Sequence, residues 1–339
     1  MHPTEPSAPP PLLTDLVLEG GGVKGVGHVG AVMRLVEAGY SFPRVAGTSA
    51  GAIVGALVAA LEQAGEPLSR LEDLMRSLDF RRFPDRGLSG RLAWFLGDAV
   101  SLLVEDGLYE GDYLRKWLGG VLADLGVRTF GDLRLPPDPG SDLPESRRYR
   151  LLVTGSDLSR QQLVRLPWDY GDYGLDPDSQ RVVDAVRISA SIPLFFEPVH
   201  LKAAAGGVST LVDGGVLSNY PIALFDRQDG RPPRWPTFGV KLSARLGDRP
   251  ITRPVRGPLA VGLATVETLL SASDAAYVDD PCVRRRTIFV DSSGVSPVDF
   301  DISTARRDRL YAGGRRAAAS FLRTWDFPAW VHDCRPGLA

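Results

Sequence analysis

The serine in Gly47-Thr48-Ser49-Ala50-Gly51 has the sequence setting of a catalytic nucleophile. The G-x-S-x-G pattern follows the short run Arg44-Val45-Ala46 and precedes a helix-forming stretch, AIVGALVAAL. A serine on a sharp turn between a strand and a helix is exposed to substrate, and small neighbours let the strand and the helix approach closely. The positive end of the helix dipole then favours the negative charge that develops as the serine attacks an acyl group. The motif therefore predicts acyl-transfer chemistry at Ser49.

A second candidate site is a glycine-rich turn that could bind a negatively charged group, LEGGGVKG at residues 18–25. It connects an apolar run that we expect to be a strand with residues 26–38, which we expect to be a helix. Backbone N–H groups at such a junction bind a phosphate or an oxyanion. The amides of this turn, together with that of Ala50, could receive the oxyanion of a tetrahedral intermediate.

Two nucleotide-binding patterns fit this turn poorly. Gly20, Gly22 and Gly25 satisfy G-x-G-x-x-G, but a dinucleotide site also needs an acidic residue about 20 positions later to hold a ribose hydroxyl. No Asp or Glu stands between Glu37 and Glu62. A Walker phosphate loop is excluded because the lysine of the turn precedes its last glycine and no Ser or Thr follows in the required place.

A nucleophilic serine needs a general base, and the sequence offers histidines and one well-placed aspartate. The four histidines, none with a motif around it, are His2, His28, His200 and His332. Asp213 follows a short apolar run and precedes Gly214 and Gly215, which let the backbone turn sharply and expose the carboxylate. The residues alone leave open a plain Asp-Gly turn and a Ser-His-Asp triad that uses His200 or His332.

Three motifs of this chain, in their order, resemble those of the patatin-like phospholipases: G-G-G-x-K-G, G-T-S-A-G and D-G-G. The patatin-like phospholipases are lipid acyl hydrolases with a serine–aspartate dyad. The resemblance extends over residues 15–322 and includes SASIPLFFEPV at 189–199, LVDGGVLSNYP at 211–221 and the late block TIFVDSSGVSPVDFDIS. It is loose over residues 66–148, which leaves the substrate range open.

The resemblance assigns roles to individual residues. It implies that Ser49 is the nucleophile, that Asp213 is the base, and that Gly21 and Gly22 donate to the oxyanion beside Ala50. Lys24 adds positive charge to this oxyanion hole. The remaining supporting residues are Gly20, Gly25, Gly47, Gly51, Gly214 and Gly215. No metal and no cofactor is implied.

The order of the expected elements predicts an α/β fold. Strand, glycine turn, helix, short strand, tight turn and helix alternate over residues 15–61, which is typical of a parallel sheet. Further strands are expected at residues 149–154, 162–166, 211–212, 237–242 and 287–290, and further helices at 66–78 and 303–324. With the resemblance, we expect a three-layer patatin-like fold whose central, mostly parallel sheet is flanked by helices, with Ser49 on a nucleophile elbow.

We expect one catalytic domain over residues 15–325, between a flexible N-terminal tail at 1–14 and a C-terminal tail at 326–339. Residues 66–148 are interpreted as a cap or variable insertion. Within them, residues 80–112 carry four arginines ahead of an apolar cluster that contains Trp94 and Phe95. This pattern fits a cap over an apolar pocket or a membrane-facing element, and it also fits an ordinary buried helix.

Composition narrows the class of protein. A chain of 339 residues with 44% hydrophobic content can bury a large core, and a net charge of −2 gives no general attraction for nucleic acid. No apolar stretch reaches the roughly 20 residues of a membrane span. Cys282 and Cys334 lack metal-ligand spacing and argue against a disulfide framework or a zinc site. We therefore expect a cytoplasmic protein whose membrane contact, if any, is peripheral; its oligomeric state is left open.

The leading hypothesis is a hydrolase of phospholipid or other lipid acyl esters that works through an acyl-Ser49 intermediate. Because an ordinary aspartate is a weak base, we expect the site to raise the pKa of Asp213 by burial or to hold it in a short hydrogen bond. One alternative is a Ser-His-Asp carboxylesterase or thioesterase. The other is a regulatory module that keeps the glycine turn as a phosphate cradle without turnover.

Overall fold

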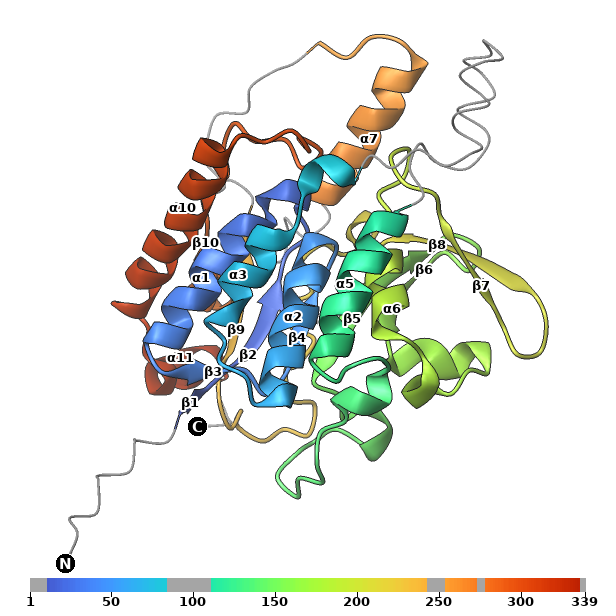
Figure 1. Cartoon of the computed structure of the whole chain (residues 1–339). Helices are drawn as coiled ribbons and strands as arrows, with labels where there is room; N and C mark the ends of the chain where they lie inside the picture. Colours follow the sequence, from blue (N-terminus) through green and yellow to red (C-terminus); the bar gives the residue numbers. More distant parts are fainter. Residues whose placement is uncertain (1–10, 84–110, 243–253, 273–277, 336–339) are drawn as a thin grey trace, which may run out of the picture.

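An eight-stranded sheet forms the centre of the protein (Figure 1). The computed structural model describes residues 11–83, 111–242, 254–272 and 278–335. The strands of this sheet are β2 (Asp15–Leu18), β4 (Val45–Gly47), β5 (Leu151–Asp157), β6 (Gln162–Leu166), β7 (Val199–Lys202), β8 (Val208–Asp213), β9 (Thr237–Lys241) and β10 (Thr287–Phe289). They lie in the order β10-β9-β2-β4-β5-β8-β7, and β6 pairs with β5.

One half of the sheet is parallel and the other half is antiparallel. Strands β10, β9, β2, β4 and β5 pair in parallel, whereas β6, β8 and β7 extend the sheet in antiparallel pairs. The carboxyl ends of β2, β4 and β9 therefore meet at one edge, where the loops that follow them can build a site. The sheet is therefore mixed, and the parallel part that the sequence predicted is the half that carries β2, β4 and β9.

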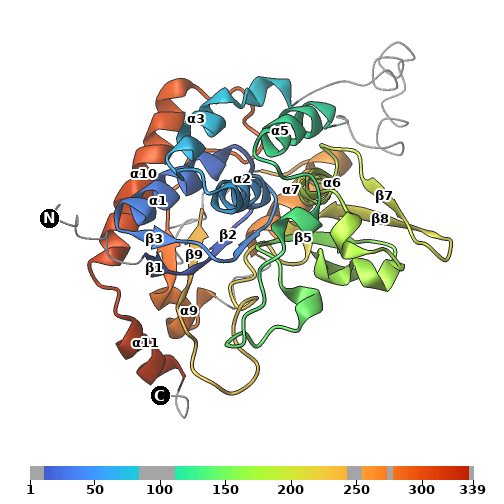
Figure 2. The ribbon, with the colours of Figure 1, turned by 60° about the horizontal axis from the view of Figure 1, so that its bottom comes forward.

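Helices cover both faces of the sheet in three layers (Figure 2), as predicted. The longer helices are α1 (Val26–Glu37), α2 (Ala50–Ala64), α3 (Arg70–Ser77), α5 (Asp112–Asp124), α6 (Val182–Ser189), α7 (Pro258–Ala272), α10 (Thr304–Leu322) and α11 (Phe327–Cys334). Alternate side chains of β2 lie on opposite faces of the sheet. Leu16 and Leu18 pack into the main core, and Val17 packs into a smaller core with Tyr220 and Phe225. A strand with both faces buried is continuously apolar, which explains the run that marked this strand in the sequence.

Helix α2 occupies the centre of the helical layer. Its residues from Ala50 to Leu61 are all buried, because it packs on β4 and β5 and against the helices around it. A helix that is apolar on every side belongs in such a position. It ends at Gly65, whose φ of 65° places it in the left-handed conformation that glycine adopts without strain.

Most of the predicted elements are present with bounds shifted by a few residues. The predicted helix at residues 303–324 is α10, and the one at 66–78 is the shorter α3. His200, which was expected to follow a strand, lies inside edge strand β7. Helices α5, α6 and α7 were not predicted. The aromatic cluster with Trp94 and Phe95 falls in residues 84–110, outside the described residues.

The two predicted tails contain regular structure. In the N-terminal one, β1 (Leu12–Leu13) pairs in parallel with β3 (Tyr40–Ser41). In the C-terminal one, α11 begins after Asp326, whose side chain accepts a hydrogen bond from the Ala329 amide and caps the helix. Trp330 of this helix is buried, so the segment packs on the fold.

The prediction that the cysteines form no disulfide was wrong. Cys282 in α9 (Pro281–Arg285) and Cys334 in α11 are joined by a disulfide bond. The buried Trp330 indole also donates to the Cys282 carbonyl, at 3.0 Å, so the two helices are already in contact. Disulfides are typical of oxidising compartments, and the cysteines therefore no longer support the cytoplasmic location that we expected.

Replacing both Cys282 and Cys334 with serine is expected to lower the free energy of unfolding by about 2–4 kcal/mol. The bond links positions 52 residues apart and so restricts a long loop in the unfolded chain. Urea denaturation of the variant and of the parent, each with and without a reductant, measures the effect. The reductant should destabilise the parent to the level of the variant and leave the variant unchanged; equal stability of all four samples would contradict the prediction.

No helix in the described residues is both long enough and apolar enough to cross a membrane.

Candidate active site

Ser49 sits on the turn between β4 and α2, as the motif predicted. Its backbone has φ 53° and ψ −120°, an unfavourable conformation for a residue other than glycine. The flanking glycines make the turn sterically feasible. A Cβ on Gly47 would lie 2.2 Å from the Gly51 carbonyl oxygen, and a Cβ on Gly51 would lie 2.2 Å from that of Leu18. The surrounding packing thus holds a strained nucleophile elbow, a feature that concentrates at functional sites.

The backbone of Ser49 is also fixed from a distant part of the chain. Its amide donates a hydrogen bond of 2.8 Å to Ser189 Oγ, which is buried at the end of α6. Its neighbour Thr48 is bonded through its hydroxyl to that of Thr154 on β5, at 2.6 Å. Neither contact was predicted. Ser189 opens the segment SASIPLFFEPV, so the resemblance marked the right segment without revealing the contact.

Asp213 ends β8 beside Ser49 and is completely buried. Its Oδ1 accepts a 2.8 Å hydrogen bond from the Gly215 amide, while no donor in the described part of the chain bonds to Oδ2. Burial raises the pKa of Asp213 to about 7, against the opposing effects of the Gly215 amide and the Ser49 hydroxyl. An aspartate with this pKa can take and return a proton near neutral pH.

The glycine after Asp213 is required by close packing. A Cβ on Gly214 would lie 2.4 Å from Thr154 Oγ1 and 2.6 Å from the Thr154 carbonyl oxygen. Because Thr154 also bonds to Thr48, the ends of β4, β5 and β8 come together here. Close packing against Thr154 therefore requires glycine at position 214, in addition to the sharp turn of the backbone.

The glycine turn faces Ser49 across a narrow pocket. Gly20, Gly21, Gly22, Lys24 and Ser49 line this pocket, whose cavity is about 40 Å³. Its apolar wall is formed by Ile192, Leu242, Leu270 and Pro297. Sequence reasoning predicted the glycine side of the pocket and missed its apolar side, which comes from four separate parts of the chain.

Two amides of the glycine turn have no acceptor. Among the described residues, the N–H groups of Gly21 and Gly22 donate to no backbone or side-chain atom. The Gly20 amide, by contrast, donates to the Asn219 carbonyl at 3.2 Å, and Asn219 Nδ2 donates back to the Gly20 carbonyl at 3.2 Å. Asn219 thus fixes the turn and lines the pocket, although sequence reasoning gave it no role.

Beneath the turn, the buried side chain of Glu19 is held by two donors. One is the Lys241 ammonium, and the other is the Leu242 amide, at 2.5 Å. The Glu19 carbonyl bonds to Nε2 of buried His28, at 2.7 Å. Burial lowers the pKa of His28 to about 4, so this histidine is neutral at neutral pH and supports the turn structurally.

The other two histidines within the described residues are not part of this pocket. His200 is exposed on β7, where its Nδ1 is 3.4 Å from Thr210 Oγ1. His332 is exposed on α11 and bonds to Asp333 at 2.9 Å. Among the residues that the structure describes, no histidine lines the pocket, and the titratable group beside Ser49 is the buried Asp213.

Comparison with known proteins shows the family to which the chain belongs. The sequence matches the model of the family described as patatin-like phospholipase over residues 16–226. This match covers more than half of the chain, so the protein belongs to the patatin-like phospholipase family. Membership supports lipid acyl hydrolase activity in general.

Individual relatives differ in how much they share with this chain. YqhO of Bacillus subtilis, an uncharacterised protein, is 37% identical over 317 residues that cover 92% of this chain and 99% of YqhO. Mb2594 of Mycobacterium bovis, named as an uncharacterised NTE family protein, is 27% identical over 61% of this chain and 27% of its own length. The crystal structure of VipD from Legionella pneumophila matches with a TM-score of 0.50 and 18% identity, covering 94% of this chain and 68% of VipD. This last likeness shows the fold alone.

Proposed function

We infer that the protein hydrolyses acyl esters of phospholipids or related lipids through an acyl-Ser49 intermediate, with Asp213 as the general base. The observation that carries this proposal is the buried Asp213, whose pKa is about 7, beside a serine on a strained elbow. Family membership supports lipid esters as the substrate class.

In the first half of the reaction, Ser49 Oγ attacks the acyl carbonyl while Asp213 takes the hydroxyl proton. The carbonyl oxygen becomes an oxyanion, which receives hydrogen bonds from the amides of Gly21, Gly22 and Ala50. The Ala50 amide supports this role because it begins α2 and has no acceptor among the described residues. When the tetrahedral intermediate collapses, Asp213 returns the proton to the departing alcohol.

In the second half, water replaces the alcohol. Asp213 takes a proton from the water, whose oxygen attacks the acyl carbon and forms a second oxyanion in the same hole. Collapse of this intermediate frees Ser49, which recovers its proton from Asp213, and releases the fatty acid. Lys24 lines the same pocket and adds positive charge near both intermediates.

The surroundings of the pocket favour a lipid substrate. Ile192, Leu242 and Leu270 provide apolar contact for an acyl chain. Leu270 belongs to α7, and that helix also carries the exposed Val261 and Leu269, which are 51% and 41% exposed. Exposed apolar side chains on a helix that also contributes to the pocket support peripheral contact with a lipid surface during catalysis.

The test is direct measurement of ester hydrolysis with chemical labelling of the nucleophile. Phosphatidylcholine vesicles and soluble p-nitrophenyl butyrate are incubated with the protein, and released fatty acid and p-nitrophenol are quantified. A fluorophosphonate probe should label the protein once, and peptide mapping should place the label on Ser49. Absence of hydrolysis and of labelling would leave the glycine turn as a phosphate cradle and reject the proposal.

Gly22→Ala is expected to lower kcat by about 100-fold or more, the cost of losing one oxyanion donor. The Gly22 backbone has φ 55°, and an added Cβ would lie 1.9 Å from the Pro297 carbonyl oxygen, so the turn must move. Steady-state hydrolysis of p-nitrophenyl butyrate gives kcat for this variant.

Gly65→Ala is the matched control for this substitution. Gly65 has a similar φ of 65°, but an added Cβ would meet no atom within 4 Å. It should cost about 1 kcal/mol of stability through backbone strain and leave kcat unchanged. An unchanged kcat in Gly22→Ala would remove that glycine from the proposed oxyanion hole.

A further inference from the structure

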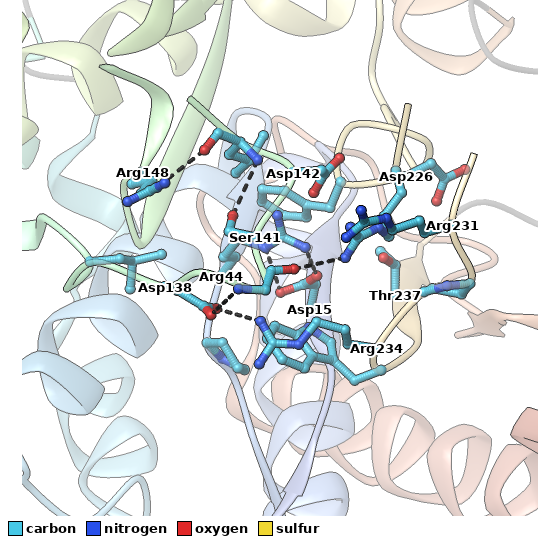
Figure 3. A pocket seen from close by; sticks show the side chains of 18 of the residues that line it. Asp15, Arg44, Asp138, Ser141, Asp142, Arg148, Asp226, Arg231, Arg234 and Thr237 are labelled. Carbon is cyan, nitrogen blue, oxygen red and sulfur yellow. Dashed lines mark hydrogen bonds and ion pairs between the residues drawn. The ribbon is translucent and has the colours of Figure 1, made fainter. Parts of the chain in front are cut away.

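A second and larger cavity lies at the opposite edge of the sheet from Ser49 (Figure 3). It is lined by Asp15 and Thr237, the first residues of β2 and β9, and by Arg44 and Arg286, which directly precede β4 and β10. Because these strands are parallel, this edge carries their amino ends and Ser49 lies beyond the carboxyl end of β4. The cavity is about 170 Å³ and is separate from the proposed ester-cleaving site.

The lining of this cavity carries an excess of positive charge. Seven arginines and four aspartates line it. Asp226 alone accepts hydrogen bonds from both Arg286, at 2.5 and 2.8 Å, and Arg335, at 2.6 Å. Arg148 donates to the Leu143 carbonyl at 3.1 Å and forms no ion pair with any described carboxylate. Asp229, outside the lining, pairs with Arg227, so five aspartates face the seven arginines and positive charge remains in excess.

One of these arginines also has a buried donor without an acceptor. Arg286 is 3% exposed, and its Nε bonds to no atom in the described part of the chain. A buried donor in this state is unfavourable, so an acceptor atom that enters the cavity would be stabilised there. Guanidinium groups recognise phosphate and carboxylate oxygens with paired hydrogen bonds.

Apolar surface completes the cavity. Leu135 and Pro136 line it together with Phe225, on which the Arg44 guanidinium stacks at 4.8 Å. Arg234, which bonds to Asp138, stacks in the same way on the lining residue Trp235, at 4.7 Å. Figure 3 shows the arginine and aspartate side chains gathered around this one space. A ligand here would contact cationic and apolar groups at the same time.

The arginines that share Asp226 are held in place by the disulfide. Arg286 directly follows α9, Arg335 directly follows Cys334 at the end of α11, and the Cys282–Cys334 bond joins the two helices. A wall built in this way is preorganised, which reduces the entropy lost when a ligand binds.

We propose that this cavity binds a small organic anion, in which a phosphate or carboxylate group is attached to an apolar body. The excess of arginine and the unpaired Arg286 donor recognise the anionic group, and the Leu135, Pro136 and Phe225 side chains contact the apolar part. The site is independent of ester hydrolysis at Ser49.

Isothermal titration calorimetry on the full chain tests this proposal with 1-naphthyl phosphate, 1-naphthoate and neutral 1-naphthol. At least one of the two anions should bind saturably to one site, and naphthol should not bind there. The tighter of the two anions identifies the group that the cavity prefers. Saturable binding of neither anion up to about 1 mM, which corresponds to roughly −4 kcal/mol, would overturn the proposal.

Arg148→Gln combined with Arg231→Gln should weaken binding at least tenfold, since each loss removes a charged donor. Arg148 has no ion pair to lose, and Arg231 lies 3.8 Å from Asp229, so the fold should tolerate both changes. Arg76→Gln with Arg115→Gln, on helices α3 and α5, is the matched control and should bind within about twofold of the parent.

Two further measurements keep the result interpretable. Arg148→Lys with Arg231→Lys retains both charges and should retain most of the affinity, whereas a merely structural role would not distinguish lysine from glutamine. Hydrolysis of p-nitrophenyl butyrate should be the same in all these variants, so failure of the anion site and failure of the proposed esterase are seen separately. Unchanged anion affinity in the double glutamine variant would show that this cavity is not the binding site.

Discussion

Ser49→Ala is expected to lower kcat by on the order of a million-fold, because no covalent acyl intermediate can form without the nucleophile. The fold should remain intact, since the hydroxyl interacts with Asp213 and no backbone hydrogen bond of the turn depends on it. The bond that holds the turn runs from the Ser49 amide to Ser189 Oγ and survives the substitution. Burst and steady-state kinetics with p-nitrophenyl butyrate, together with fluorophosphonate labelling, measure the effect.

The matched control is Ser303→Ala. Ser303 precedes α10, is exposed, and makes no hydrogen bond that caps that helix. It should keep the full kcat and the single fluorophosphonate label. If Ser49→Ala instead retains more than a tenth of the parent activity, the covalent mechanism is wrong.

Ser189→Ala tests the contact that positions the elbow. The Ser49 amide would lose its buried acceptor, and the strained φ of 53° would be less well held. We expect kcat to fall by about tenfold, far less than for Ser49→Ala, with the pH dependence of the reaction unchanged. A loss of stability without any change in kcat would show that Ser189 only supports the fold.

The parts of the site that could be predicted from the sequence are those that local backbone geometry determines. The elbow around Ser49, the glycine turn and the Asp213-Gly214-Gly215 turn each have a backbone conformation that short runs of glycine signal. The turns were therefore visible as short motifs. The contacts that require these glycines were not visible in the sequence, because most of them join distant segments, as between Gly22 and Pro297 or Gly214 and Thr154.

The contacts that connect these turns could not be predicted, because they join residues far apart in the chain. Ser189 lies 140 positions from Ser49, and Asn219 lies 199 positions from Gly20. The disulfide was missed for a similar reason, since Cys282 and Cys334 meet only once α9 and α11 pack together. The arginine-lined cavity collects side chains from Arg44 to Arg335 and leaves no motif in the sequence at all.

The pH dependence of the parent should follow the protonation of Asp213. Only the carboxylate can accept the Ser49 proton, so kcat/KM should rise with pH, reach half its maximum near the pKa of about 7, and level off above it. A pH–rate profile with p-nitrophenyl butyrate measures this midpoint. A midpoint near 4 would mean that the aspartate is not buried in the working enzyme.

Asp213→Asn should lower kcat by at least about 100-fold to 10,000-fold and abolish this pH dependence, because the amide keeps the shape of the side chain without its basicity. His200→Ala and His332→Ala should stay within about tenfold of the parent, since both histidines are exposed and lie outside the Ser49 pocket. A histidine variant that loses as much activity as Asp213→Asn, with native circular dichroism, would replace the dyad by a triad.

Asp213→Asn should also raise the free energy of unfolding, by an amount that increases with pH. The pKa of Asp213 is raised from 3.8 to about 7 on folding, so the native state holds its proton more tightly than the unfolded state. The cost of burying the charged form is absent below pH 4, grows as the pH rises toward 7, and reaches about 4 kcal/mol at most above it. Asn carries no charge, so Asp213→Asn should resist urea better than the parent at pH 8 and equally at pH 4.

Asp157→Asn, at another buried aspartate, should instead lower the free energy of unfolding. Asp157 accepts hydrogen bonds from the Ser159 and Arg160 amides, at 2.8 and 3.0 Å, and from the Tyr173 hydroxyl, at 2.7 Å. An amide cannot accept all three, so this variant should lose roughly 1–3 kcal/mol at pH 8 while it retains activity. If both aspartate variants lose stability at pH 8, burial has not placed an uncompensated charge at Asp213, and the carboxylate lacks the raised basicity that the proposed mechanism requires.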